Sequence, residues 1–362
     1  MINTDVAVIG GGPAGLSAAI AAADMGAHVT IIDRNHELGG QLLKQTHMFF
    51  GSREEYASTR GFDIANILKE ELKERSVEVL LNTTAVGYYK DDGVWALEEG
   101  EDKFVKLKAK KTIVATGAME RHLLFPNNDL PGIYGAGAVQ TLMNQYGVMP
   151  GKKVLMVGAG NIGLIVSYQL LQAGVEVSAI IDAAPAIGGY LVHASKVRRQ
   201  GVPILTSYTV KRAYGNEVLE GATIVKVDEG FRQIPGTEID MDIDTMCIAV
   251  GLNPLVELLW QAGCKMRYIP QLGGHVPVKD EDYETTVKGI YVAGDAAEIE
   301  EATSAMVEGR LAGLNAAHAI GFDNGNYARE KDNALKRLNA LRSGPVGAKI
   351  RNGLLKLAEE AV

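Results

Sequence analysis

Glycine residues at a fixed spacing follow the first apolar run of the chain. They are Gly10, Gly12 and Gly15, in the stretch "VAVIGGGPAGLSAAIAAA". In such a pattern the first glycine makes a tight strand-to-helix turn, the second lets a diphosphate approach the backbone, and the third lets the helix pack on the strand. The free N–H groups and the dipole at the helix start then favour negative charge. This turn, with Pro13 and Ala14, therefore predicts a dinucleotide site.

An acidic residue follows the turn at a distance typical of nucleotide binding. Asp33 ends the next strand, about twenty residues on, where a carboxylate binds the ribose hydroxyls of an adenosine. The run "KVLMVGAGNIGLIVSYQLLQAGVEVSAIID" repeats the strand, turn, helix and strand later in the chain. The residues of this second predicted site are Gly158, Gly160, Asn161, Ile162, Gly163 and Asp182.

The segment after the second acid indicates which pyridine nucleotide would bind. It reads "AAPAIGG" and holds no arginine for a 2′-phosphate. An acid without a neighbouring base favours NAD(H) over NADP(H). We therefore expect one site to keep its cofactor permanently and the other to exchange a nicotinamide nucleotide.

Composition limits the classes of protein to which the chain belongs. Of its 362 residues, 47% are apolar and 22% are charged, which is ordinary for a globular protein with room for two domains. The net charge of −8 and the lack of a basic stripe argue against nucleic acid as a partner. The uncharged run 154–175 is long enough to span a bilayer, but a glycine turn divides it into strand and helix. We therefore expect no membrane span.

The N-terminus and the cysteine content both favour a cytoplasmic protein. "MINTDVAVIG" has neither a positively charged start nor a cleavage pattern, and it leads directly into a strand. The only cysteines are Cys247 and Cys264, so we expect no disulfide framework, no iron–sulfur cluster and no metal site. Cys247 lies in "TMCIAVG" and is expected to be a small core residue.

Four further motifs extend the comparison: "GGQL" at 39–42, "TIVATGA" at 112–118, "CIAVGLNP" at 247–254 and "GIYVAGDAA" at 289–297. With them the chain resembles the two-dinucleotide-binding-domain flavoproteins, the superfamily of thioredoxin reductase and glutathione reductase. Within it, "LGGHVPVKDEDYETTVKGIYVAGDAAE" looks most like the FAD-binding subunits of multi-subunit amine and imino-acid dehydrogenases. That group includes opine oxidase, hydrogen cyanide synthase, dye-linked proline dehydrogenase and the alpha subunit of sarcosine oxidase.

The resemblance implies an α/β fold with two Rossmann-like dinucleotide-binding domains, each a parallel sheet with an antiparallel β-meander, the second inserted in the first. The expected parts are an FAD-binding domain (1–118 and 284–325), an NAD(H)-binding domain (119–283) and a C-terminal helical tail (326–362). In the tail, Leu335, Leu338 and Leu341 predict a helix, and Gly344 and Pro345 predict its end. The tail is net basic, which fits either a solvated helix face or a partner with an acidic surface.

The resemblance also implies which residues bind FAD. Asp295 would bond the ribitol chain, and Thr303 and Ser304, in a helix that begins at Ala302, would lie near the flavin O2. The dipole of that helix would stabilise charge on the reduced flavin. Gln41 would lie beside the flavin ring. The other residues expected to contact a cofactor are Arg34, Gly40, Leu42, Val86, Ala115, Thr116, Gly117, Gly251 and Gly294.

Two departures from the superfamily limit the chemistry. Thioredoxin reductase has a CxxC before the second turn, where this chain reads "GIYGAGAVQTL", and "GGQLLKQTHMFF" lacks the cysteine pair of glutathione reductase. Reduction through a dithiol is therefore excluded. Residues 325–362 also lack the cysteines of the iron–sulfur segment that often follows the FAD domain in amine dehydrogenases. Any cluster would belong to another chain.

Three polar residues after the first acid are candidates for a catalytic contribution: Gln41, Lys44 and His47. Since histidine titrates near neutrality, His47, or else Lys44, could tune the flavin or donate a proton. The alternative is a loop residue that is hydrogen-bonded for structure. Hydride transfer between two cofactors needs no protein nucleophile, so no catalytic triad is expected.

The leading hypothesis is an FAD- and NAD(H)-dependent oxidoreductase that exchanges electrons with a partner subunit or carrier. That partner would contain an iron–sulfur cluster or a flavin, and we expect the assembly to be an oligomer. One alternative is a stand-alone NADH-dependent reductase of a small acceptor. Another is a non-catalytic subunit that holds ATP or ADP structurally in the second site.

Overall fold

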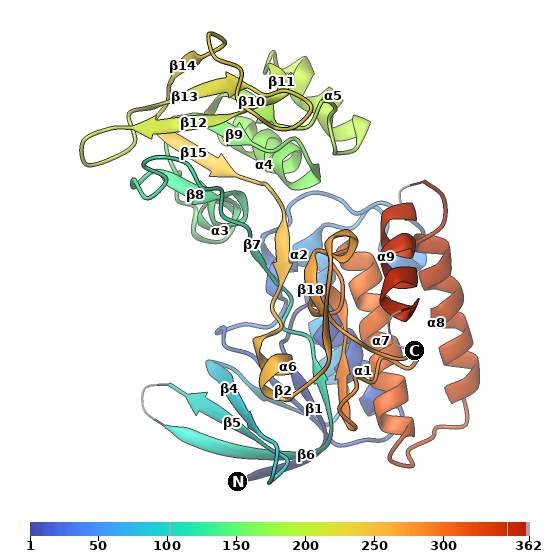
Figure 1. Ribbon diagram of the computed structural model, residues 1–362. Helices are drawn as coiled ribbons and strands as arrows, with labels where there is room; N and C mark the ends of the chain where they lie inside the picture. The colour runs from blue at the N-terminus through green and yellow to red at the C-terminus, as the bar shows by residue number, and fades with distance from the viewer. Residues whose placement is uncertain (101–102, 346, 360–362) are drawn as a thin grey trace. The chain divides into compact units, whose positions relative to one another are not determined.

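A computed structural model of the chain describes residues 1–100, 103–345 and 347–359 (Figure 1). The chain folds into two compact units. Met1–Met119 and Leu252–Val362 form unit 1, and Glu120–Gly251 form unit 2. Unit 2 is therefore inserted in unit 1, as the sequence predicts.

The chain returns to unit 1 earlier than the predicted boundary at residue 283. Strand β16 (Leu252–Pro254) pairs with β7 (Ala118–Glu120) immediately after unit 2 ends. Helix α6 (Glu257–Gln261) then buries Leu259 in the apolar cluster that contains Trp95. The segment from residue 252 to residue 283 belongs to unit 1 because its apolar side chains complete that core.

Unit 1 is built on a parallel sheet that an antiparallel meander extends. Its parallel strands, in spatial order, are β3 (Val77–Leu80), β2 (Val29–Ile32), β1 (Ile2–Ile9), β6 (Phe104–Val114) and β19 (Ile290–Val292). The first part of β6 pairs antiparallel with β5, and β5 pairs antiparallel with β4. These two strands span Val94–Glu99 and Thr83–Tyr89. Strand β2 is buried along its whole length, as expected for a parallel strand covered on both faces.

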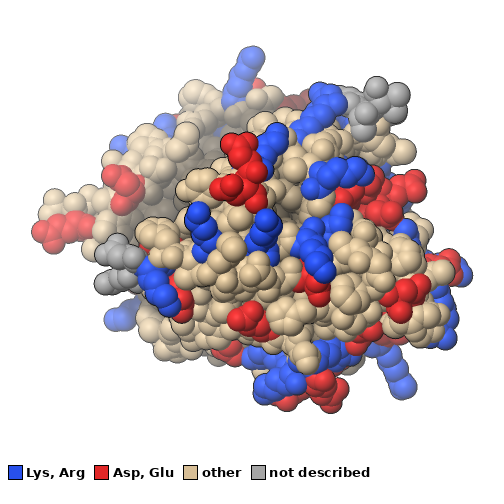
Figure 2. Space-filling model, turned by 90° about the horizontal axis from the view of Figure 1, so that it is seen from below, with Lys and Arg blue, Asp and Glu red and all other residues tan. Residues whose placement is uncertain are grey.

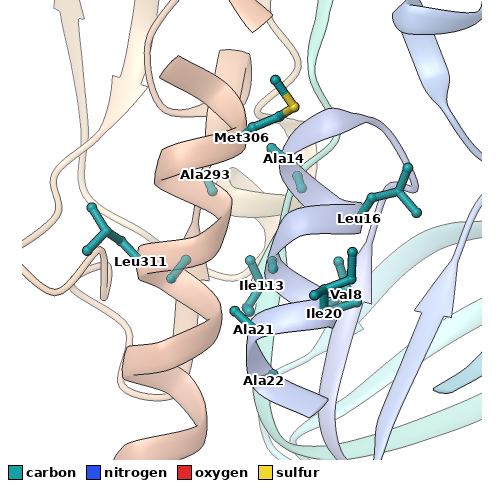
Figure 3. Close-up of a cluster of buried hydrophobic side chains, with 14 of the residues drawn as sticks. Val8, Ala14, Leu16, Ile20, Ala21, Ala22, Ile113, Ala293, Met306 and Leu311 are labelled. Atoms are coloured by element: carbon teal, nitrogen blue, oxygen red, sulfur yellow. The ribbon is translucent and has the colours of Figure 1, made fainter. Parts of the chain in front are cut away.

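Two helices rich in small residues, α1 (Pro13–Asp24) and α7 (Ala302–His318), pack side by side in unit 1 (Figure 3). Glycine makes their close approach possible. A Cβ atom at Gly309 would lie 2.0 Å from the carbonyl oxygen of Ala14, and any side chain there would push the helices apart. Helix α2 (Gly61–Lys73) adds Ile64 to the same core.

The C-terminal segment folds onto unit 1 as two helices, α8 (Tyr327–Leu341) and α9 (Ala348–Glu359). Helix α8 buries Leu338 in the core that α1 and α7 share. Helix α9 packs Leu357 against the apolar cluster of the hairpin formed by β17 and β18. The hairpin strands and the 3₁₀ turn between them span Met266–Ile269, Gly274–Pro277 and Pro270–Leu272.

Unit 2 repeats the architecture of the first part of unit 1. Its parallel strands, in spatial order, are β11 (Ile204–Thr206), β10 (Glu176–Asp182), β9 (Lys153–Val157), β15 (Thr245–Ile248) and β8 (Ile133–Gly135). Its meander is β12 (Tyr208–Tyr214), β13 (Gly221–Lys226) and β14 (Ile239–Asp242), and its helices are α3 (Ala136–Tyr146), α4 (Asn161–Gln172) and α5 (Leu191–Arg199). The predicted fold class, two such α/β units with one inserted in the other, is confirmed.

Charges on the surface are mixed in sign. On the face drawn in Figure 2, basic and acidic side chains are interspersed. Among the helices of the described residues, none combines the length and the apolar character that crossing a membrane requires.

Candidate functional site

The first glycine turn leads from β1 into α1 and tolerates no side chain at two of its positions. Gly10 has φ +106°, and a Cβ atom there would lie 2.3 Å from the carbonyl oxygen of Ala115. A Cβ atom at Gly15 would lie 1.7 Å from the carbonyl oxygen of Gly10. Only glycine therefore permits this turn and the close packing of α1 against β1.

Asp33 holds the first turn in place from the end of β2. Its Oδ2 accepts the backbone N–H of Gly11 at 2.6 Å, and its Oδ1 accepts the backbone N–H of Asn35 at 2.8 Å. The residue is only 6% exposed. The carboxylate thus lies directly beside the turn, where the sequence placed it.

The second turn, between β9 and α4, has the same geometry. Gly158 has φ +117°, and a Cβ atom at Gly163 would lie 2.0 Å from its carbonyl oxygen. Asp182 accepts the backbone N–H of Ala159 at 2.7 Å and that of Ala184 at 2.8 Å. These bonds correspond one by one to those of Asp33.

A glycine pair, which we call the glycine strap, closes over each turn, and only the first of the two contributes to the predicted contacts. Gly39 donates its N–H to the carbonyl oxygen of Gly11 at 2.8 Å, and a Cβ atom at Gly40 would lie 2.8 Å from the Cα of Gly12. In unit 2, Gly189 packs on the second turn in the same way: its N–H donates to the carbonyl oxygen of Ala159 at 3.0 Å. A Cβ atom at Gly189 would lie 2.9 Å from the carbonyl carbon of Gly160.

The signal for this second glycine strap is present in the sequence. "DRNHELGGQL" begins at Asp33 and "DAAPAIGGYL" begins at Asp182, with the glycine pair at the same distance from the acid. Tyr190 therefore occupies in unit 2 the position of Gln41 in unit 1. Its backbone N–H donates to the side-chain oxygen of Asn161 at 2.8 Å, which ties the strap to the start of α4.

Both turns fit the diphosphate of a dinucleotide. A Cβ atom at Gly160 would meet nothing within 4 Å, and one at Gly12 would meet only the Cα of Gly40, at 4.0 Å. Open space therefore adjoins the middle glycine of each turn. Both of these glycines are helix N-caps that make no side-chain hydrogen bond, so no side chain of the cap residue covers the first N–H groups of α1 and α4. An anion is the usual partner for such N–H groups.

The predicted ribitol-binding residue, Asp295, lies in a short 3₁₀ turn, Gly294–Ala296, between β19 and α7. Burial raises the pKa of its carboxyl group to about 7, and the neighbouring acid Glu300 contributes to the shift, although the N–H of Glu300 opposes it by donating to Oδ1 at 3.3 Å. Thr303 and Ser304 are buried in the first turn of α7. These residues stand together on consecutive elements of unit 1.

The three candidate catalytic residues follow the first glycine strap. Gln41 is exposed and Lys44 is partly buried in the 3₁₀ turn Gly40–Lys44, which buries Leu42 in the core. The ring of His47 stacks on Phe49, with centroids 5.7 Å apart and an interplanar angle of 12°. Stacking on a residue that is itself buried fixes the orientation of the imidazole.

The remaining predicted contacts are distributed over both units. Ala115 is buried at the end of β6, and the Thr116 hydroxyl donates to the carbonyl oxygen of Leu255 at 2.7 Å. Gly117 has φ +76°, and Arg34 is exposed after Asp33. Two further residues are exposed, Val86 at an irregularity of β4 and Gly251 at the end of unit 2.

The cysteines do not form a redox pair. Cys247 and Cys264 are both free and buried, and they lie in different units. Burial raises the pKa of each thiol, which keeps it protonated. The absence of a dithiol, which the sequence predicted, is confirmed.

Comparison with known proteins identifies the family. Residues 4–309 match the family described as pyridine nucleotide-disulphide oxidoreductase, and the chain belongs to it. FAD and a pyridine nucleotide are the cofactors of this oxidoreductase family and of its thioredoxin reductases, as predicted.

Two curated relatives are components of larger enzymes. The alpha subunit of sarcosine oxidase from Rhizobium meliloti (strain 1021) is 30% identical over 321 residues, which cover 85% of this chain and 30% of that protein. The opine oxidase component of Agrobacterium tumefaciens (strain Ach5) that is named as its A subunit is 30% identical over 347 residues, which cover 86% of this chain and 65% of that protein. The chain thus spans less than two thirds of either relative.

Solved structures share the fold. L-proline dehydrogenase from P. horikoshii superimposes with a TM-score of 0.69 at 26% identity, over 92% of this chain and 59% of that chain. Thioredoxin reductase from T. acidophilum gives a TM-score of 0.73 at 22% identity, over 88% of this chain and 99% of that chain. The second likeness is one of fold alone.

Proposed function

We propose that the chain moves a hydride between NAD(H) in unit 2 and FAD in unit 1, and exchanges electrons with a partner subunit or carrier. The observation that carries this proposal is the pair of equivalent turns, each bonded by an aspartate through the same backbone N–H. When bound, FAD supplies the ring that accepts or releases the hydride.

In unit 1, the first N–H groups of α1 would bind the diphosphate of FAD and Asp33 its ribose. Asp295 would bond the ribitol hydroxyls, and a carboxyl group with a pKa of about 7 can both donate and accept hydrogen bonds near neutral pH. The start of α7, with Thr303 and Ser304, would stabilise negative charge at the ring through the helix dipole. The other residues assigned to FAD are Gly10, Gly12, Pro13, Ala14, Gly15, Arg34, Gly40, Leu42, Val86, Ala115, Thr116, Gly117 and Gly294.

Three side chains after the strap are assigned to the flavin ring. Gln41 would orient the ring, and His47 or Lys44 would hold or release a proton beside it. The fixed stacking of His47 on Phe49 supports a defined position for that imidazole. A proton-transfer role requires such a fixed position more than it requires a particular resting pKa.

In unit 2, the turn before α4 would bind the diphosphate of NAD(H), and Asp182 would bind the adenosine ribose. The segment from Ala183 to Gly189 has no base, which favours NAD(H) over NADP(H). Gly251 and the glycine strap would border the same site. The residues assigned to this site by the turn itself are Gly158, Gly160, Asn161, Ile162 and Gly163.

A partner subunit is the finer part of the proposal. Two relatives that match most of this chain are named as subunits of sarcosine oxidase and opine oxidase. We infer that this chain likewise serves an amine or imino-acid dehydrogenase, with an iron–sulfur or flavin-containing partner. An oligomeric, cytoplasmic assembly stays a prediction from the sequence.

The experiment is anaerobic addition of NADH to the purified, reconstituted protein. We expect rapid loss of the flavin absorbance, with NADPH much slower because unit 2 offers no base to its phosphate. An unchanged spectrum would contradict the NADH half of the proposal. Denaturing the protein and identifying the released nucleotides distinguishes the alternatives, since ATP or ADP in place of NAD(H) indicates a structural second site.

A further inference from the structure

A buried group of charged side chains joins the C-terminal segment to α7. Arg342, directly after α8, bonds three carboxylates: Glu298 at 2.8 Å, Glu300 at 2.6 Å and Glu308. Glu298 and Glu308 are almost completely buried, and Arg342 is only 8% exposed. These three carboxylates lie close enough together for a metal ion, but the guanidinium already serves as their counter-ion.

The carboxylates that Arg342 bonds are themselves connected to the predicted flavin-binding turn. Glu308 accepts the backbone N–H of Gly294 at 2.9 Å, on the N-terminal side of Asp295. Glu300 donates its own N–H to Oδ1 of Asp295 at 3.3 Å, on the C-terminal side. Arg342 therefore holds both ends of the segment 294–300 through two different side chains.

The charges in this group are unusual for a purely structural contact. Lys279 bonds Glu298 at 3.1 Å, so two cations face three carboxylates in the apolar interior. Burial and the charge of Glu298 raise the pKa of Glu308, whereas Lys279 and Arg342 hold the pKa of Glu298 below its usual value despite burial. Because apolar side chains often stabilise a buried site as well as such a network does, stability alone does not require these charges. Geometric specification of the attached backbone does.

We propose that Arg342 is a positioning residue for the flavin, which fixes the Gly294–Asp295 turn through Glu308 and Glu300. This inference rests on the proposed function, in which unit 1 holds FAD at Asp295. The family match ends at residue 309, so this support comes from a part of the chain outside it.

The test compares two arginines of the C-terminal segment, Arg342→Met and Arg337→Met. Arg337 is a matched control because it also bonds a buried glutamate, Glu55, at 2.7 Å, but no residue of the segment 294–300 among its described contacts. We expect both variants to lower the melting temperature. Only Arg342→Met should weaken FAD binding, by about tenfold or more, and shift the flavin midpoint potential.

Two more variants keep the test decisive if Arg342→Met does not fold. The double variant Arg342→Met/Glu308→Gln removes one charge of each sign, and the glutamine can still accept the N–H of Gly294. It should therefore fold while leaving Asp295 less well fixed. Arg342→Lys should recover part of the stability but not the wild-type potential, because an ammonium cannot reproduce the guanidinium geometry.

The outcomes are distinct from those of the proposed function. If the wild-type protein binds no FAD, the proposed function is wrong. If it binds FAD and the Arg342 variants match Arg337→Met in FAD affinity and potential, the positioning role alone is wrong.

Discussion

The two glycine turns of this chain are nearly identical, but their surroundings differ. Each has an aspartate that accepts the same backbone N–H and a glycine strap that packs on the middle glycine. In unit 1, helix α7 backs the turn so closely that Gly309 meets Ala14, and the Arg342 group is attached to α7. In unit 2 the helix after the turn is flanked by α3 and α5, and the described residues contain no equivalent charged group.

This difference matches the two roles that we propose. A cofactor that stays bound gains from a rigid site, because little conformational entropy is then lost on binding. A nucleotide that exchanges in each turnover needs a site with fewer supports. The same turn thus serves as a permanent holder in one unit and as an exchange site in the other. The predictions below test that division of roles.

The largest effects should come from the third glycine of each turn. Gly15→Ala and Gly163→Ala place a methyl group 1.7 Å and 2.0 Å from a carbonyl oxygen, a clash that we expect to cost about 3 kcal/mol or more. Gly15→Ala should give a colourless or unfolded protein. Gly163→Ala should remain yellow but lose reduction by NADH by about a hundredfold or more. Stopped-flow spectra measure both, and a colourless Gly163→Ala would break the comparison.

The buried acid of unit 1 should make the stability of the FAD-free protein pH-dependent. The pKa of Asp295 is raised from 3.8 to about 7 in the folded chain, so its contribution is intact below about pH 4. It is then lost as the pH rises to about 7, at a total cost of about 4 kcal/mol. Asp295→Asn carries no such charge. Urea unfolding of both proteins from pH 4.5 to 7.5 should therefore show the variant gaining relative stability, and a constant difference would contradict the buried carboxyl group.

Replacing the two aspartates should separate the two cofactors. Asp33→Ala should weaken FAD, and Asp182→Ala should weaken NADH, each by about ten- to hundredfold, since a hydrogen bond to a charged group contributes about 1.5–3 kcal/mol. Equilibrium titration of each ligand measures the effect. Weaker FAD binding in Asp182→Ala, rather than weaker NADH binding, would show that the units have been assigned in the wrong order.

The smallest effect should come from the second glycine strap. Gly189→Ala places a Cβ atom 2.9 Å from the backbone of Gly160, so we expect NADH to bind about tenfold more weakly. Gly188→Ala is the control, because a Cβ atom there meets nothing within 4 Å. Equal NADH affinities in the two variants would mean that the strap does not support the site.

Much of the candidate site could be predicted because its signals are local. The glycine spacing and the acid at the end of the next strand follow from backbone geometry within about thirty residues. The positions of Gly10, Gly15 and Asp33 agree with that reasoning. The return of the chain to unit 1 at residue 252 could not be predicted in the same way, because it depends on which core buries the apolar residues of α6.

The sequence by itself determined that two strand–turn–helix units exist, that each ends in an aspartate, and that no dithiol is present. Only the tertiary structure decided what supports each unit. Arg342 meets Glu298 and Glu308 across separations of 44 and 34 residues, and Gly309 meets Ala14 from the other end of the chain. A spacing rule describes neighbours along one element, whereas these contacts arise because two distant helices bury the same surface.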